Sequence, residues 1–134
     1  MDTWGWVAWA VQSDPGHSRA EGLISEIRRQ SGQLVTTNFV LAEALTRLRY
    51  DFGLPPALKL ADVVAALAGQ QHVAVTIVDA SLWADALTWF RRFDDQRLSF
   101  VDCTSFAIME ALGLREALTA DRHFATAGFV PLGL

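Results

Sequence analysis

The chain has 134 residues, of which 51% are hydrophobic, and its formal net charge is -4. This size and apolar content predict a single domain, residues 1–134, and the net negative charge argues against a broad electrostatic grip on nucleic acid. No apolar run reaches the roughly 20 residues that a membrane span needs, and Asp2 stands where a signal peptide would carry basic residues. We therefore expect a cytoplasmic protein.

Helical and strand-like segments alternate along the chain. Helices are expected at 19–30, 38–50, 55–68, 79–93 and 100–112, and strands at 33–36, 72–78, 117–120 and 129–132. Asn38 is expected to cap the second helix, the two prolines suit the start of the third, and Gly113 ends the last. This order predicts an α/β fold, a three-layer sandwich with a short, mainly parallel central sheet flanked by helices.

The periodicity also predicts which faces are buried. The helix 38–50 has an apolar stripe of Leu41, Ala44, Leu45 and Leu48, and the core face expected for 79–93 comprises Leu82, Trp83, Ala86, Leu87, Trp89 and Phe90. The strand 72–78 is rich in β-branched residues and is expected to be buried. Pro131 cannot donate to a ladder, so the last strand is expected at an edge.

Four acidic residues, Asp2, Glu43, Asp102 and Asp121, lie at the starts or ends of apolar segments. Carboxylates in such surroundings need a positive partner, commonly a divalent cation. Asp121 follows a strand and Asp2 precedes the first helix, which places both near the carboxyl edge of the sheet, where open α/β folds bind ligands. The pattern suggests a metal-dependent hydrolase.

Three of the four acids also have a structural explanation. Glu43 could pair with Arg47 one turn later, and Asp121 could be an ordinary turn residue. Ser99 and Asp102 have the spacing of a capping box, with Asp in place of the usual Glu. Taken singly, the four positions do not distinguish these roles from metal binding.

Four segments in order resemble the motifs of the PIN-domain ribonucleases, and within them of the VapC-type toxins of toxin–antitoxin pairs. These segments are Asp2-Thr3-Trp4, Thr36 to Glu43, Leu98 to Cys103 with its continuation through Gly113, and Thr119 to Phe124. The resemblance covers nearly the whole chain. It implies an RNA endonuclease dependent on Mg²⁺ or Mn²⁺, with Asp2, Glu43, Asp102 and Asp121 as catalytic metal ligands and Thr3 as an accessory polar contact.

The resemblance further implies attack by water on the phosphodiester, leaving a 5′-phosphate and a 3′-hydroxyl. It also implies an RNA substrate and a small antitoxin partner. The tryptophan-rich segments 4–9 and 83–89 add the expectation of a homodimer. A general DNA nuclease is a further alternative, which only a substrate assay separates from a ribonuclease.

The chain departs from the family pattern at its first strand, which looks truncated because Asp2 directly follows Met1. Loss of a central strand is expected to leave ladder groups unpaired and Asp2 poorly held. Either the natural start lies upstream, or the domain is an inactive PIN scaffold that binds an antitoxin or RNA.

The remaining residues with chemical potential have plainer expected roles. Cys103, the single cysteine, is expected to be a small buried apolar residue, and His17 and His72 to be structural or exposed. His123 is expected to pack beside Phe124 at a turn, with phosphate contact as the alternative. Ser105 lies one turn after Asp102 and could face the site.

Trp4, Trp6 and Trp9 are expected in the core or at an interface. The arginine pairs, Arg28 with Arg29, Arg47 with Arg49 and Arg91 with Arg92, form either a basic rim or solvated helix faces.

Overall fold

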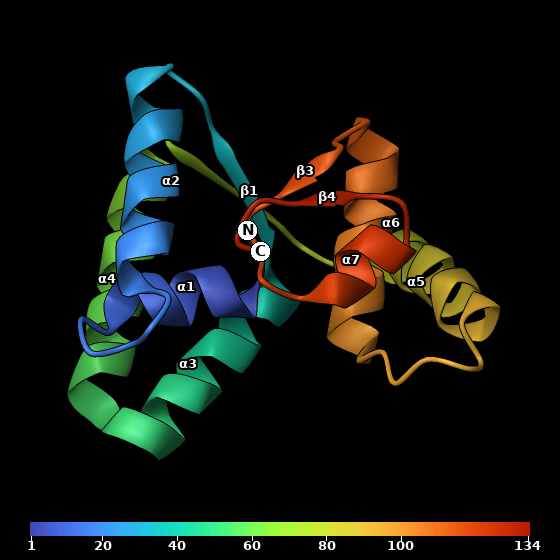
Figure 1. The fold of residues 1–134 in the computed structure, drawn as a ribbon, viewed down its shortest axis with the longest axis horizontal. Coiled ribbons are helices and arrows are strands. Elements are labelled where there is room, and N and C mark those ends of the chain that lie inside the picture. The colour runs from blue at the N-terminus through green and yellow to red at the C-terminus, as the bar shows by residue number, and fades with distance from the viewer.

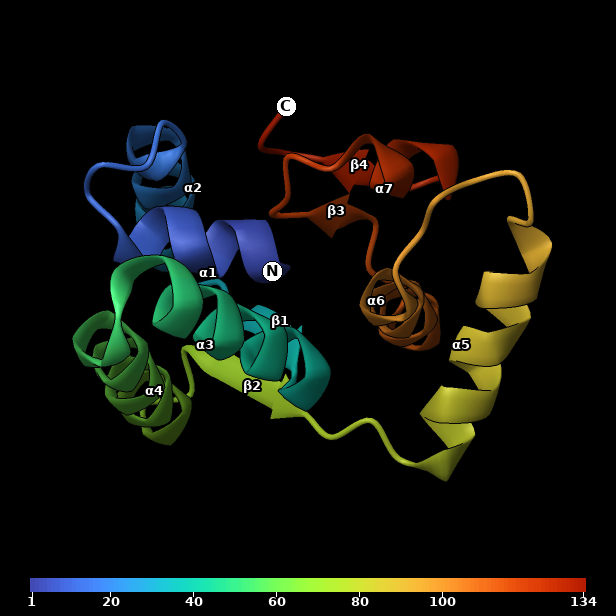
Figure 2. The same cartoon turned by 90° about the horizontal axis from the view of Figure 1, so that it is seen from below.

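The computed structural model describes residues 1–134, which form helices and short strands in alternation (Figure 1). In chain order the elements are α1 (Thr3–Ala10), α2 (His17–Arg29), β1 (Leu34–Thr37), α3 (Asn38–Phe52), α4 (Leu54–Gly69), β2 (Val73–Thr76), α5 (Ala80–Arg92), α6 (Phe100–Leu112), β3 (Glu116–Ala117), α7 (Arg122–Thr126) and β4 (Val130–Pro131). All expected helices and strands are present, with ends displaced by a few residues at most, and α1 and α7 are additional. The strands lie in the middle with helices on both sides, as expected for an α/β sandwich (Figures 1 and 2).

Five helices begin at a polar side chain that accepts a hydrogen bond from the first turn. These N-caps are Asp2, Thr37, Asp79, Ser99 and Asp121. The prediction that Asn38 caps α3 is wrong. Thr37 has the extended backbone that a cap requires and accepts from the N–H of Val40, whereas the side chain of Asn38 accepts from the N–H of Val78. The caps place Asp2 and Asp121 at helix N-termini.

The strands form two parallel pairs rather than one continuous sheet. β1 pairs with β2 from Leu34 opposite Val73 to Thr37 opposite Thr76, and β3 pairs with β4 at Glu116 opposite Val130. β4, which contains Pro131, has a strand neighbour on one side only, so the edge position predicted for it is confirmed.

Met1 and Asp2 lie between the two strand pairs and bond to both. The amino group of Met1 donates to the carbonyl of Val35 over 2.6 Å, and the N–H of Asp2 donates to the carbonyl of Leu118 over 3.3 Å. A cavity of about 500 Å³ adjoins them, lined by β1 and by residues 113–118. Met1 and Asp2 link the two pairs by these bonds without forming a strand of their own. The expectation that Asp2 is poorly held is wrong, because its backbone is bonded here.

The buried apolar residues form two clusters. The first joins α1–α4 with β1 and β2 and includes Trp6, whose indole N–H donates to the hydroxyl of Thr36 over 3.1 Å. The second joins α5, α6 and α7 and includes Phe106 and Phe124. The core role expected for Trp6 is confirmed, and so is the stripe on α3, where Ala44 and Leu48 are fully buried.

Two predictions of burial are wrong. Trp83 and Phe90 of α5 are 44% and 46% exposed, because α5 packs mainly against α6, which covers only part of its apolar face. β2 is buried only at Val73, since it has a strand neighbour on one side alone. None of the helices combines the length and apolar character needed to cross a membrane.

Candidate active site

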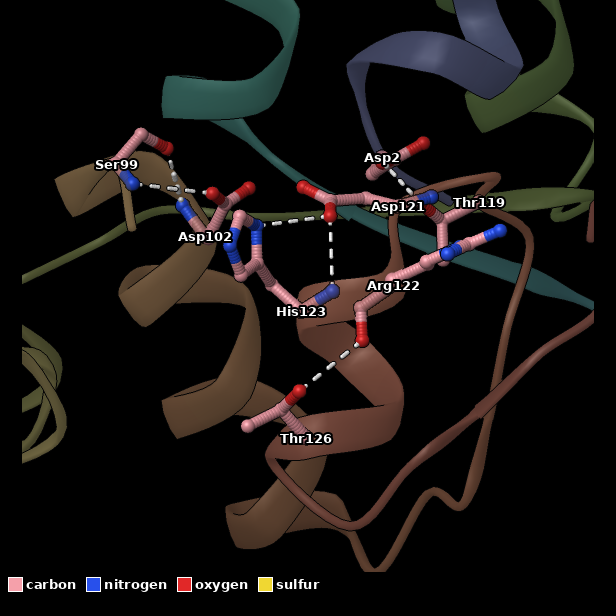
Figure 3. A network of polar contacts seen from close by, with 8 residues as sticks. All are labelled: Asp2, Ser99, Asp102, Thr119, Asp121, Arg122, His123 and Thr126. Atoms are coloured by element: carbon pink, nitrogen blue, oxygen red, sulfur yellow. Dashed lines mark hydrogen bonds and ion pairs between the residues drawn. The ribbon is translucent and has the colours of Figure 1, made fainter. Parts of the chain in front are cut away.

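The four acids predicted from the sequence lie on four different helices, each near an N-terminus. Asp2 caps α1 and Asp121 caps α7, while Asp102 lies in the first turn of α6 and Glu43 in the second turn of α3. Figure 3 shows Asp2, Asp102 and Asp121 close together in the gap between these elements. The positive end of a helix dipole stabilises a nearby carboxylate, which helps the fold hold several acids in one place.

Asp2 and Asp121 are joined through Thr119, which is fully buried. The Thr119 hydroxyl donates to Oδ2 of Asp2 over 2.5 Å and accepts from the N–H of Asp121 over 2.9 Å. The other oxygen of Asp2, Oδ1, accepts from the N–H of Gly5 over 3.1 Å. The single hydroxyl therefore fixes one acid by its side chain and the other by its backbone.

Glu43 is held by Thr3, the second residue of the first motif. The Thr3 hydroxyl donates to Oε2 of Glu43, which ties the start of α1 to α3. The alternative pairing of Glu43 with Arg47 does not occur, and the only ion pairs in the structure are Arg29 with Glu26 and His123 with Asp121. No lysine or arginine therefore neutralises any of the four acids.

Asp102 has the structural role considered for it. It completes the predicted capping box, since its N–H donates to Oγ of Ser99 over 3.0 Å and its Oδ2 accepts from the N–H of Ser99 over 3.1 Å. Burial raises the pKa of Asp102 above its usual value, hydrogen bonds from Ser99 oppose the rise, and the charges of Asp121 and Glu43 add to it.

Burial raises the pKa of Asp2 to about 6, and the charge of Asp102 adds to the rise, whereas hydrogen bonds from Thr119 and Gly5 and the positive charge of the Met1 amino group oppose it. Asp102 thus interacts electrostatically with each of the other three acids. The charges of the other three acids therefore act through Asp102, whereas the group of ligand atoms that all lie within 4.8 Å of one another contains Asp102, Asp121 and His123 but neither Asp2 nor Glu43.

The donor set fits a divalent ion. Ligand atoms of Asp102, Asp121 and His123 all lie within 4.8 Å of one another. Carboxylate oxygens are the ligands that Mg²⁺ and Mn²⁺ prefer.

Two residues that contact the acids, Thr119 and His123, were not predicted as site residues. Thr119 appears in the fourth motif only as a neighbour of Asp121, and His123, expected to pack at a turn, has its Nδ1 2.9 Å from Oδ1 of Asp121 (Figure 3).

The other residues considered lie outside this cluster. Ser105 is buried and lines the cavity beside Met1 and Asp2. Cys103 is buried, as predicted, and burial raises the pKa of its thiol to about 11, so it is not a nucleophile near neutral pH. His17 bonds to the carbonyl of Ala8 and His72 is exposed, in agreement with their expected roles.

Known proteins resemble this chain over nearly its whole length. The PIN domain family matches residues 1–130. The chain is 35% identical over 130 residues to the 23S rRNA-specific endonuclease VapC20 of Mycobacterium tuberculosis, in strains CDC 1551 and H37Rv, covering 97% of this chain and 94% of the relative. The crystal structure of M. tuberculosis VapC20, described as a Sarcin-Ricin loop cleaving toxin, superposes with a TM-score of 0.83 and 32% identity, covering 96% of this chain and 94% of that one.

Proposed function

The chain belongs to the PIN domain family, and within it to the VapC group, and from this premise we propose that it is a metal-dependent endoribonuclease. Its proposed ligands for Mg²⁺ or Mn²⁺ are Asp2, Glu43, Asp102 and Asp121. One observation carries the proposal. Asp102 interacts electrostatically with the three other acids, and no lysine or arginine pairs with any of them. A divalent cation would supply the missing positive charge.

A divalent ion bound there would lower the pKa of a coordinated water and offset charge on the phosphate being attacked. The chain's own residues hold the acids in place for this task. Thr119 fixes Asp2 and the backbone of Asp121, Thr3 fixes Glu43, and Ser99 fixes Asp102. The hydroxyls of Thr119 and Thr3 donate to Asp2 and Glu43, and the backbone N–H of Ser99 donates to Asp102, so each carboxylate is oriented by an uncharged donor.

The proposed substrate is RNA, and the proposed role is the toxin of a type II toxin–antitoxin system. Support comes from the VapC20 relative, whose name records cleavage of 23S rRNA. The test is to incubate the purified protein with Mn²⁺ and an RNA hairpin of the sarcin–ricin type, beside DNA of the same sequence. We expect cleavage of RNA alone, with 5′-phosphate ends. Cleavage of DNA at a similar rate would favour the general DNA nuclease, and no cleavage of either would favour the inactive scaffold.

The alternative of an inactive scaffold rested on a loosely held Asp2. In the structure Asp2 receives hydrogen bonds on both side-chain oxygens and donates from its backbone N–H. This arrangement supports the enzyme over the scaffold, because a metal ligand must be fixed in advance to act.

We also propose that the protein forms a homodimer and binds a small antitoxin. Trp6 of the segment 4–9 is buried and therefore does not support a dimer interface, whereas Trp83 and Phe90 on α5 expose apolar surface that could form one.

Light scattering tests the dimer, and it should give a dimer for the wild type and a monomer for Trp83→Arg. Co-expression with the neighbouring gene product should yield a complex and relieve growth arrest. A wild-type monomer would refute the dimer, and failure to co-purify would refute this antitoxin pairing.

A further inference from the structure

His123 lies in the first turn of α7 beside two of the proposed ligands, and the proposed function gives it no role. Its Nδ1 is 2.9 Å from Oδ1 of Asp121, and one ligand atom from each of Asp102, Asp121 and His123 fits within 4.8 Å. Figure 3 shows its ring between Asp102 and Asp121. The ring is thus part of the acid cluster, although it was expected to pack at a turn.

The position of His123 is fixed by the start of α7. Its backbone N–H donates to Oδ1 of Asp121 over 2.9 Å, so the cap and the ring approach the same oxygen. The next residue, Phe124, is fully buried and meets Phe106 of α6 with ring centroids 4.9 Å apart. This packing holds α7 against α6, the helix that carries Asp102.

The spacing suits a shared ion. Ligands at about 2.1 Å from an octahedral ion lie about 3 Å apart when they are neighbours and about 4.2 Å apart when they are opposite. The 2.9 Å between Nδ1 and Oδ1 equals the spacing of a neighbouring pair, and ligand atoms of all three residues lie within 4.8 Å of one another. These separations would allow the three residues to share one ion.

We propose that His123 is a nitrogen ligand of the divalent ion held by Asp102 and Asp121, and that it favours first-row transition ions such as Mn²⁺ over Mg²⁺. This inference rests on the proposed function, because it assumes an ion at the quartet. Imidazole nitrogen binds transition ions well, whereas Mg²⁺ prefers oxygen and keeps its waters. Loss of the ring should therefore weaken Mn²⁺ binding more than Mg²⁺ binding.

The test uses Mn²⁺ and Mg²⁺ alone, without RNA. Pulsed electron paramagnetic resonance of wild-type protein with bound Mn²⁺ should show coupling to a nitrogen, and His123→Ala should lose it. In calorimetry, His123→Ala should raise the Kd for Mn²⁺ by about tenfold or more and change the Kd for Mg²⁺ much less. The matched control is His72→Ala, at an exposed histidine outside the site, which should behave as wild type. Metal-free melting of each variant confirms folding.

The outcomes separate this inference from the proposed function. Mn²⁺ that binds the wild type without nitrogen coupling would overturn the role of His123 and leave the acid site intact. Equal weakening of Mn²⁺ and Mg²⁺ by His123→Ala would show that the ring only orients Asp121 by a hydrogen bond, which also overturns the inference. Absence of any divalent binding to the wild type would overturn the proposed function as well.

Discussion

The buried hydroxyl of Thr119 lies 2.5 Å from Oδ2 of Asp2, a residue 117 positions earlier in the chain. The hydroxyl oxygen of Thr119 also accepts a hydrogen bond from the N–H of Asp121 over 2.9 Å. Thr119 thereby connects the start of α1 with the start of α7 and holds two of the four acids at a common point. Its role in the site is to position these acids, since its hydroxyl is already hydrogen-bonded to both Asp2 and Asp121.

Replacement of Thr119 tests this link. Thr119→Val keeps the shape of the side chain but removes both hydrogen bonds, so we expect Mn²⁺ affinity and RNA cleavage to fall by about 10- to 100-fold. Thr119→Ser keeps the hydroxyl and should retain most of both. The measurements are calorimetry and single-turnover cleavage. Equal performance of the valine and serine variants would show that the hydroxyl does not position the acids.

Asp102 and Ser99 form a capping box, and their separate substitution distinguishes a cap from a metal ligand. Asp102→Asn keeps an acceptor oxygen for the cap and removes one charge from the cluster, so the metal-free protein should melt no lower than wild type while losing RNA cleavage. Ser99→Ala should cost about 1 kcal/mol of stability and retain cleavage. Thermal melting and a cleavage assay on the same samples distinguish the two roles. Near-normal cleavage by Asp102→Asn would show that Asp102 is only a helix cap.

The raised pKa of Asp2, about 6 because of burial, predicts a pH dependence of stability without metal. The folded state holds the proton more tightly than the unfolded chain, so this contribution is complete below about pH 4 and is lost as pH rises through 6. Asp2→Asn lacks this loss. Its stability relative to wild type should therefore grow between pH 4 and 6, by on the order of 3 kcal/mol at most.

The check is chemical denaturation of both proteins in EDTA across this pH range. Saturating Mn²⁺ supplies the control, since the ion should stabilise wild type and bind Asp2→Asn poorly, which reverses the order above pH 6. A constant difference between the two proteins at all pH values would mean that Asp2 titrates normally in the fold.

The cavity beside Met1 predicts the effect of an added strand. Val35 and Leu118 face each other across the position of Met1 and Asp2 and already accept hydrogen bonds from them. An apolar extension of about 4 to 6 residues before Met1 has the length of an ordinary strand and could pair with both edges. We expect it to raise the melting temperature by at least about 4 °C and to increase the cleavage rate. A glycine–serine extension of equal length is the control, and equal effects of the two would refute strand insertion.

The sequence predicted most of the elements because their signals are local. The helix 100–112 matches α6 at both ends, since Ser99 and Gly113 supply a cap and a left-handed stop that act within one turn. The position of the four acids near helix N-termini was also predicted, from their places at the edges of apolar segments together with the motif resemblance.

The features that could not be predicted depend on contacts between distant segments. Thr119 has no sequence spacing that reveals its bond to Asp2, and the approach of His123 to Asp121 required the unexpected helix α7. The periodicity of α5 correctly identified an apolar face, but it could not show that α6 covers only part of it and leaves Trp83 exposed. Similarly, Asp2 is held by a local bond from Gly5 and by bonds to Leu118 and Thr119, which lie near the other end of the chain.

The central claim is that the acid quartet binds a divalent ion, and Mn²⁺-dependent melting tests it most directly. An ion that binds only the folded state adds stability by mass action, about 2.7 kcal/mol at 100 times its Kd. We predict that millimolar Mn²⁺ raises the melting temperature of the wild type, that EDTA reverses the rise and stops RNA cleavage, and that Asp102→Asn shows neither effect. An unchanged melting temperature across millimolar Mn²⁺, with cleavage that persists in EDTA, would contradict the metal mechanism.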